Sequence, residues 1–176
     1  EQIIDNLNQP ALFDADALNI IAQHNEIKQK FTQLNNKIIT PHPTEAARLL
    51  DCSTQEIQDD RFEAVRKLAK KYNATVVLKG AGSLICQKDE VYINTTGNQC
   101  MAVAGQGDVL SGIIGAFLAQ GLDALSASRL AVYVHGKAGD NLVKKLGGFV
   151  GVFPSRVAEE VCDVLNNYSS HDNITK

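Results

Sequence analysis

The stretch Met101–Gly112 has the composition of a ligand-binding turn, because it is small, weakly charged and rich in glycine, and it carries the acid Asp108. It runs into the apolar segment Ile113–Gln120, which predicts a buried helix. Gly105 and Gly107 allow a tight turn with no side chain in the way of a ligand. The first N–H groups of a helix that starts there are unpaired, and with the helix dipole they form a site for a phosphate or a developing anion. This environment favours the ionised form of Asp108, which could then accept a proton from a substrate.

A simpler interpretation of the segment Gly105–Asp108 is helix capping. Aspartate is a favoured residue at helix starts, and glycine often precedes a helix. Short glycine motifs also occur by chance. This stretch alone therefore leaves both interpretations open.

Two further segments carry polar groups at the ends of predicted strands. His42 lies between Pro41 and Pro43, which fix the backbone around it, so it is either a rigidly presented functional group or a solvated loop histidine. Lys79 ends an apolar strand, where a lysine is costly unless it has an anionic partner such as a phosphate. The turn Gly80–Ser83 follows it and offers N–H groups and one hydroxyl.

The acids Asp14 and Asp16 end a short apolar strand. Open α/β sheets place ligand and metal groups at the carboxyl ends of their strands. Asp14 or Asp16 could therefore orient a Mg²⁺–phosphate group, directly or through water. For Asp16 we favour a role in capping the helix that follows.

Strands alternate with helices along the chain, which implies an α/β layered fold with a largely parallel sheet. Within the longest helix, His135 and Asp140 are expected to make core or surface hydrogen bonds. The pattern predicts strands over 9–16, 37–40 and 74–80, a β-hairpin of 83–86 and 90–93, helices over 17–22, 44–50, 59–72, 113–120, 122–145 and 154–165, and a polar tail over 166–176.

The composition is that of a single globular domain, since 44% of the 176 residues are hydrophobic and 21% are charged. A formal net charge of -3 without a basic stripe argues against a nucleic-acid partner. No apolar run reaches transmembrane length, and the first residues lack the features of a signal peptide. The cysteines have no paired spacing that would suggest disulfides or a zinc site. We therefore expect a cytoplasmic protein with no membrane partner.

Four segments in this order, 12–19, 41–45, 77–83 and 105–112, resemble the ADP/ATP-dependent NAD(P)H-hydrate dehydratases of the ribokinase-like superfamily. The similarity runs from Pro10 to Leu165. It implies a ribokinase-like three-layer α/β/α fold with a mostly parallel central sheet and a β-hairpin. It also implies that residues 1–176 are the C-terminal majority of one such domain, since the family's sheet has further strand–helix units before Pro10.

The activity implied by this resemblance is metabolite repair by a hydro-lyase. Water would be removed from the S epimer of hydrated NADH or NADPH (NADHX or NADPHX), at the expense of ADP or ATP and with Mg²⁺. The resemblance further implies a homo-oligomer, a tetramer, and an NAD(P)HX epimerase that is fused or separate. It assigns Asp108 as catalytic base, His42 and Asp108 to the hydrated nucleotide, Lys79, Gly80, Ala81, Gly82, Ser83 and Gly107 to ADP or ATP, and Gly105, Gln106 and Gly107 to an anion hole.

Two other functions stay open. One is a small-molecule kinase of the same superfamily, of the hydroxyethylthiazole or hydroxymethylpyrimidine type, although His42 between two prolines and the segment 14–19 favour the dehydratase. The other is a non-catalytic nucleotide-binding remnant. Thr44, Ala104 and Cys100 stand where the resembling family usually has glycine, and an added Cβ could strain or narrow a turn that holds phosphate.

Overall fold

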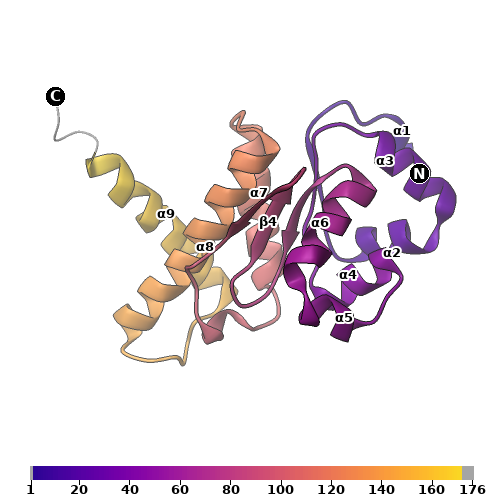
Figure 1. Ribbon diagram of the computed structural model, residues 1–176. Coiled ribbons are helices and arrows are strands. Elements are labelled where there is room, and N and C mark those ends of the chain that lie inside the picture. Colours follow the sequence, from indigo (N-terminus) through magenta and orange to yellow (C-terminus); the bar gives the residue numbers. More distant parts are fainter. Residues whose placement is uncertain (1, 172–176) are drawn as a thin grey trace.

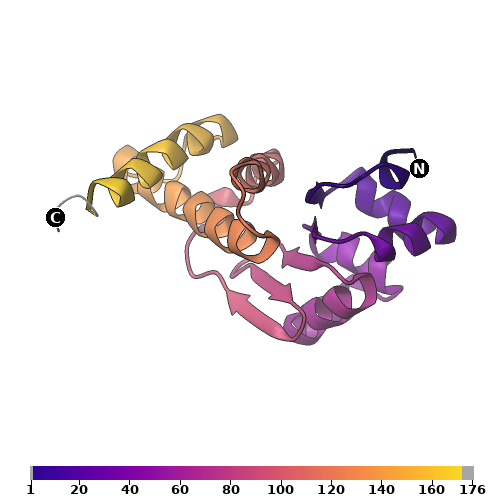
Figure 2. The same cartoon turned by 90° about the horizontal axis from the view of Figure 1, so that it is seen from above.

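A computed structural model describes residues 2–171, with side chains described for residues 4–168. The chain forms a five-stranded sheet covered by helices on both faces (Figures 1 and 2). Its elements, in order, are α1 (Gln2–Asp5), β1 (Ala11–Phe13), α2 (Asp16–Gln23), α3 (Asn25–Gln33), β2 (Lys37–Ile39), α4 (Pro43–Leu50), α5 (Thr54–Asp59), α6 (Arg61–Tyr72), β3 (Thr75–Leu78), β4 (Leu84–Gln87), β5 (Glu90–Ile93), the 3-10 helix η1 (Gln99–Met101), α7 (Gln106–Ala119), α8 (Ala124–Leu146) and α9 (Pro154–His171).

The strands lie in the order β1-β2-β3-β4-β5. β1, β2 and β3 are parallel, with Leu12 opposite Ile38 and Ile39 opposite Val76. β4 is antiparallel to both of its neighbours, β3 and β5, so β5 again runs in the direction of the first three strands. The described sheet is therefore mostly parallel and ends in the predicted hairpin.

Both faces of the sheet are buried because alternate residues of each central strand enter different cores. Ile39 and Val76 face the core formed with α2 to α6, whereas Ile38 and Val77 face the core formed with α7, α8 and α9. The alternation follows from the two-residue period of a strand and explains why Ile38, Ile39, Val76 and Val77 are all apolar, although they point to both faces. Figure 2 shows the resulting layers, with α7, α8 and α9 on one side of the sheet and the earlier helices on the other. The predicted three-layer α/β/α arrangement is confirmed.

Several details differ from the sequence prediction, which also lacked the short helices α1, α5 and η1. The last helix was expected to end at Leu165, with a polar tail from 166, but α9 continues to His171. It continues because Tyr168 packs against Tyr133 of α8, and the two hydroxyls are hydrogen-bonded. Residues 172–176 of the expected tail lie outside the described residues. The helix α3 was missed, since Ile27 and Phe31 are the apolar residues of an otherwise polar segment.

A further difference concerns Asp16, which does not cap α2. Ala15 occupies the capping position with a φ of 51°, and its side chain makes no cap hydrogen bond. Asp16 is instead the first residue of the helix, where a negative charge is stabilised by the helix dipole. None of the described helices is long and apolar enough to cross a membrane.

Candidate functional site

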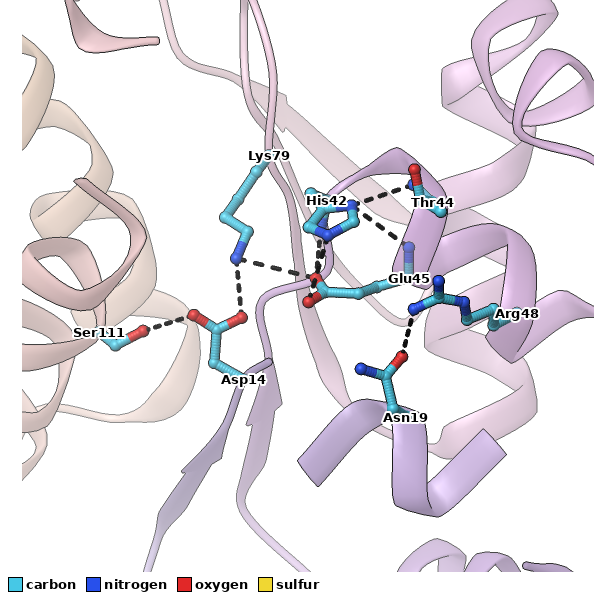
Figure 3. A network of polar contacts seen from close by, with 8 residues as sticks. All are labelled: Asp14, Asn19, His42, Thr44, Glu45, Arg48, Lys79 and Ser111. Atoms are coloured by element: carbon cyan, nitrogen blue, oxygen red, sulfur yellow. Dashed lines mark hydrogen bonds and ion pairs between the residues drawn. The ribbon is translucent and has the colours of Figure 1, made fainter. Parts of the chain in front are cut away.

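The carboxyl ends of β1, β2 and β3 meet the N-terminus of α7 in one polar network (Figure 3). Asp14 follows β1, Lys79 follows β3, and Ser111 lies one turn into α7. These are the strand ends at which open α/β sheets bind ligands. The network therefore occupies the position expected for a functional site of this fold.

Lys79 and Asp14 form the centre of the network. Nζ of Lys79 lies 2.7 Å from Oδ1 of Asp14 and 3.9 Å from Oε2 of Glu45, and the Ser111 hydroxyl donates to Oδ2 of Asp14 at 2.9 Å. The Asp14 and Glu45 side chains are only 13% and 6% exposed. Burial alone would raise the pKa of Asp14, but the Lys79 ammonium, the backbone N–H of Ala15 and the Ser111 hydroxyl together lower it below its usual value. The network thus holds an ionised carboxylate and a cation in a poorly solvated position.

His42 and Glu45 form a capping box at the start of α4. Nδ1 of His42 accepts hydrogen bonds from the backbone N–H groups of Thr44 and Glu45, at 3.1 and 3.3 Å. In return, Oε2 of Glu45 accepts from the backbone N–H of His42 at 2.8 Å. Pro43 is the first helical residue, one position before the predicted start of this helix at residue 44, and proline is well tolerated there. Since Glu45 also lies beside Lys79, the capping box connects His42 to the centre of the network.

The α7 start has the features of an anion-binding turn. Gly105 has a φ of 91°, which favours glycine, and it is the N-cap of α7. Within the described residues, the N–H groups of Gly107 and Asp108 have no acceptor, whereas that of Gln106 donates weakly to the Val103 carbonyl at 3.4 Å. A Cβ at Gly107 would lie 3.5 Å from Nζ of Lys79 and 3.8 Å from Oδ2 of Asp14. The start of α7 therefore offers two free backbone N–H groups, and the Lys79 ammonium lies beside Gly107, so a phosphate could accept hydrogen bonds from both kinds of donor.

Asp108 is exposed in the first turn of α7. It makes no hydrogen bond or ion pair with the described part of the chain. The structure thus brings Lys79, Asp14, Gly107 and, through Glu45, His42 into one network, and it leaves the Asp108 carboxylate free at the edge of that network.

The turn Lys79–Ser83 contains two residues with positive φ, and both are glycines. Gly80 and Gly82 have φ values of 149° and 62°, and the Ser83 hydroxyl donates to the Gly80 carbonyl at 3.1 Å. From the other side, the Arg61 guanidinium donates to two carbonyls of this region. The exposed N–H groups of the turn remain suited to an anionic ligand.

Thr44, Ala104 and Cys100 do not strain the backbone. None of them is among the described residues with positive φ. Thr44 sits in the first turn of α4, where its N–H is used by the His42 cap. The backbone at these three positions is therefore in a conformation that any residue adopts, and the side chains present there cause no backbone strain.

Three side chains of the site were missed from the sequence. Glu45 was detectable, since a glutamate three residues after a capping residue is a capping-box pattern. Ser111 was detectable only as a polar position one helical turn after Gly107. No sequence signal distinguishes Arg61 from the other cations of α6.

A magnesium ion carried by a nucleotide fits this donor set. The described residues contain no group of three or more acidic, histidine or cysteine side chains that could enclose a metal ion. Mg²⁺ usually keeps several waters and binds phosphates plus one or two carboxylates. Asp14, which Lys79 and Ser111 hold ionised, could supply such a carboxylate.

Two surface pockets lie away from this network. One of about 480 Å³ lies between β5 and α8, and one of about 900 Å³ lies at the opposite ends of β2 and β3. Neither includes Lys79, Asp14 or the α7 start. The candidate site, called the cradle below, is the polar network at the strand ends and is distinct from these two pockets.

His135 supports the α7 start from α8. Its Nε2 lies 2.9 Å from Oε1 of Gln106, and both side chains are buried, which confirms the core hydrogen bond expected for His135. Burial lowers the pKa of His135 to about 4. The imidazole is therefore neutral in the folded protein at pH 7, and its Nε2–H donates to Gln106.

The stability of the protein should fall as the pH falls from about 6.5 to about 4. In this window His135 binds a proton in the unfolded chain but not in the folded one, so acid favours unfolding. The loss at pH 4.5 should be about 2 kcal/mol relative to pH 7. Denaturant unfolding of the wild type and of His135→Gln at both pH values tests this. An equal pH dependence in the two proteins would contradict it.

A ribokinase-like superfamily protein from Enterococcus faecalis has the same architecture. It superimposes with a TM-score of 0.79 at 28% sequence identity, over 95% of this chain and 58% of that protein. The fold and the position of the site thus define a ribokinase-like protein, as the sequence predicted.

The family described as NAD(P)H-hydrate dehydratase matches residues 2–162. The chain belongs to this family. It is 41% identical over 157 residues to the ADP-dependent (S)-NAD(P)H-hydrate dehydratase of Neisseria meningitidis, a match that covers 89% of this chain and 53% of that protein. The ADP/ATP-dependent NAD(P)H-hydrate dehydratase of Bacillus subtilis, co-crystallised with ATP/Mg²⁺ and soaked with CoA, superimposes with a TM-score of 0.80 at 28% identity, over 95% of this chain and 60% of that one. The chain therefore spans little more than half the length of these relatives.

Proposed function

We propose that the protein removes water from the S epimer of hydrated NADH or NADPH and restores the normal cofactor, with ADP or ATP as co-substrate. The observation that carries this proposal is that the Lys79 ammonium lies beside Gly107, at a helix start where the N–H groups of Gly107 and Asp108 have no acceptor among the described residues. These groups suit the terminal phosphates of a nucleotide. Family membership and the names of the relatives support the choice of substrate.

The chemistry uses the phosphates to create a good leaving group. Asp108 takes the proton of the substrate hydroxyl while the oxygen of that hydroxyl attacks the terminal phosphorus of the nucleotide. The bond from that phosphorus to the bridging oxygen breaks, and the shortened nucleotide leaves. The nitrogen of the substrate ring then expels phosphate, and loss of a ring proton restores the double bond.

The remaining residues bind and orient. Gly105, Gln106 and Gly107 form the turn whose N–H groups stabilise charge on the transferring phosphoryl group. Lys79 and the turn Gly80–Ser83 hold the nucleotide, and His42 contacts the hydrated ring. Mg²⁺, when bound, neutralises phosphate charge, and Asp14 is placed to help hold it.

The direct test is incubation of the intact protein with S-NADHX and Mg²⁺, with ADP or with ATP. We expect the NADH absorbance to increase at about the rate at which inorganic phosphate appears, and not to increase without nucleotide. A stable phosphorylated product without NADH would indicate a kinase instead. Nucleotide binding with no reaction at all would indicate a non-catalytic remnant.

The other expectations remain predictions that this assay does not address. They are a tetrameric assembly, an NAD(P)HX epimerase acting beside the protein, and a cytoplasmic location. Gel filtration with light scattering, co-purification and cell fractionation test them in turn.

A further inference from the structure

Arg61, the first residue of α6, makes two hydrogen bonds to the backbone on either side of Gly80. Its Nη1 donates to the Ala81 carbonyl at 2.6 Å, and its Nη2 donates to the Leu78 carbonyl at 3.3 Å. A guanidinium is planar and presents several donors in a fixed geometry, so two carbonyls bound to it are held in a fixed relation. The turn after β3 is thus fastened to the start of α6.

Gly80 leaves the space that this arrangement needs. A Cβ at Gly80 would lie 2.9 Å from Nη2 and 3.3 Å from Cζ of Arg61. The guanidinium therefore packs directly against the backbone of the turn. Nε of Arg61 is buried and has no hydrogen-bond partner among the described residues. Removing this N–H group from water therefore costs free energy that no hydrogen bond offsets.

The hydrogen bond to Ala81 sets the direction of the next N–H group. In a trans peptide the C=O and N–H bonds point in opposite directions. Because the Ala81 carbonyl points at Arg61, the Gly82 N–H points to the other side of the turn. No acceptor within the described residues uses this N–H.

We infer that Arg61 is a positioning residue for the nucleotide site. It holds two carbonyl oxygens, which would repel phosphate, against α6, and so presents the Gly82 N–H to the nucleotide. Arg61 itself does not touch the nucleotide. This inference rests on the proposed function, because it assumes that the turn Lys79–Ser83 binds ADP or ATP.

Isothermal titration of the intact protein with ADP tests the inference. In Arg61→Ala the dissociation constant for ADP should rise about tenfold, and Arg61→Lys should not restore it, because one ammonium cannot reproduce the two-pronged contact. Methylguanidinium in the buffer should partly rescue Arg61→Ala. In the reaction, the KM for nucleotide should rise while kcat at saturating nucleotide changes little. Arg66→Ala, which removes an exposed cation from the same helix, is the matched control and should bind ADP as the wild type does.

A second measurement needs no ligand. Backbone ¹⁵N relaxation should show rigid residues 79–83 in the wild type, with order parameters of about 0.85, and order parameters below about 0.6 in Arg61→Ala. If the wild type binds neither ADP nor ATP, the proposed function fails, and relaxation still decides whether Arg61 orders the turn. Unchanged ADP affinity in Arg61→Ala, full rescue by lysine, or a turn that stays rigid would each overturn the inference.

Discussion

Replacing Asp108 with asparagine should reduce the dehydration rate by about 10² to 10⁴-fold, the usual range for loss of a general base. The amide has nearly the same size and can still sit in the first turn of α7, but it cannot take the hydroxyl proton. The free N–H groups of Gly107 and Asp108 belong to the backbone and are unchanged. The affinity for ADP should therefore stay close to that of the wild type.

The measurement is single-turnover formation of NADH from S-NADHX, with ADP affinity measured separately. Asp89→Asn, which alters an exposed acid beyond β4, is the control and should react at the wild-type rate. Wild-type turnover in Asp108→Asn would exclude the base role. Loss of ADP affinity with normal turnover of bound nucleotide would place Asp108 in binding instead.

Lys79→Met should both destabilise the protein and abolish tight nucleotide binding. The substitution leaves the Asp14 and Glu45 carboxylates, which are mostly buried, without their cation. Breaking a buried ion pair typically costs ~3–5 kcal/mol, and because this pair is partly solvated we expect about 2 kcal/mol. Nucleotide affinity should fall about tenfold or more, since the ammonium beside Gly107 is lost.

The double variant Asp14→Asn/Lys79→Met separates the two effects. Removing the unpaired carboxylate should return most of the lost stability, but it cannot restore the cation that binds phosphate. Urea unfolding and ADP titration on the same samples give both quantities. A Lys79→Met protein as stable as the wild type would show that Asp14 and Lys79 are coupled too weakly to organise the site.

The sequence predicted the layers of the fold well because they follow from two local signals, the apolar composition of the buried strands and the turn residues that end the helices. Apolar strands such as Thr75–Leu78 and turn residues such as Gly147, which ends α8, report their own conformation. The helix α3 and the last turns of α9 were missed, because contacts with distant residues stabilise them, whereas α5 was missed although Ser53 and Glu56 form a local capping box at its start. Phe31 of α3 packs on Phe13 and Tyr72, which no local pattern reveals.

The candidate site was predictable where a residue type is unusual for its position. A lysine at the end of a buried strand, as at Lys79, and a histidine between prolines, as at His42, stand out in the sequence. Arg61 and Ser111 do not, because their roles follow from the way α6 and α7 meet the sheet.

The site joins parts of the chain that are far apart in the sequence. Lys79 and Asp14 are separated by 65 residues, and Ser111 and Asp14 by 97. Closing such contacts costs more loop entropy than closing local ones, so we expect the cradle to form after the helices and the hairpin. During synthesis, a nascent chain cannot assemble the cradle before α7 has left the ribosome. Nucleotide would then stabilise only chains in which the cradle has formed. The nucleotide concentration in the cell would therefore shift the balance between folded protein and folding intermediates.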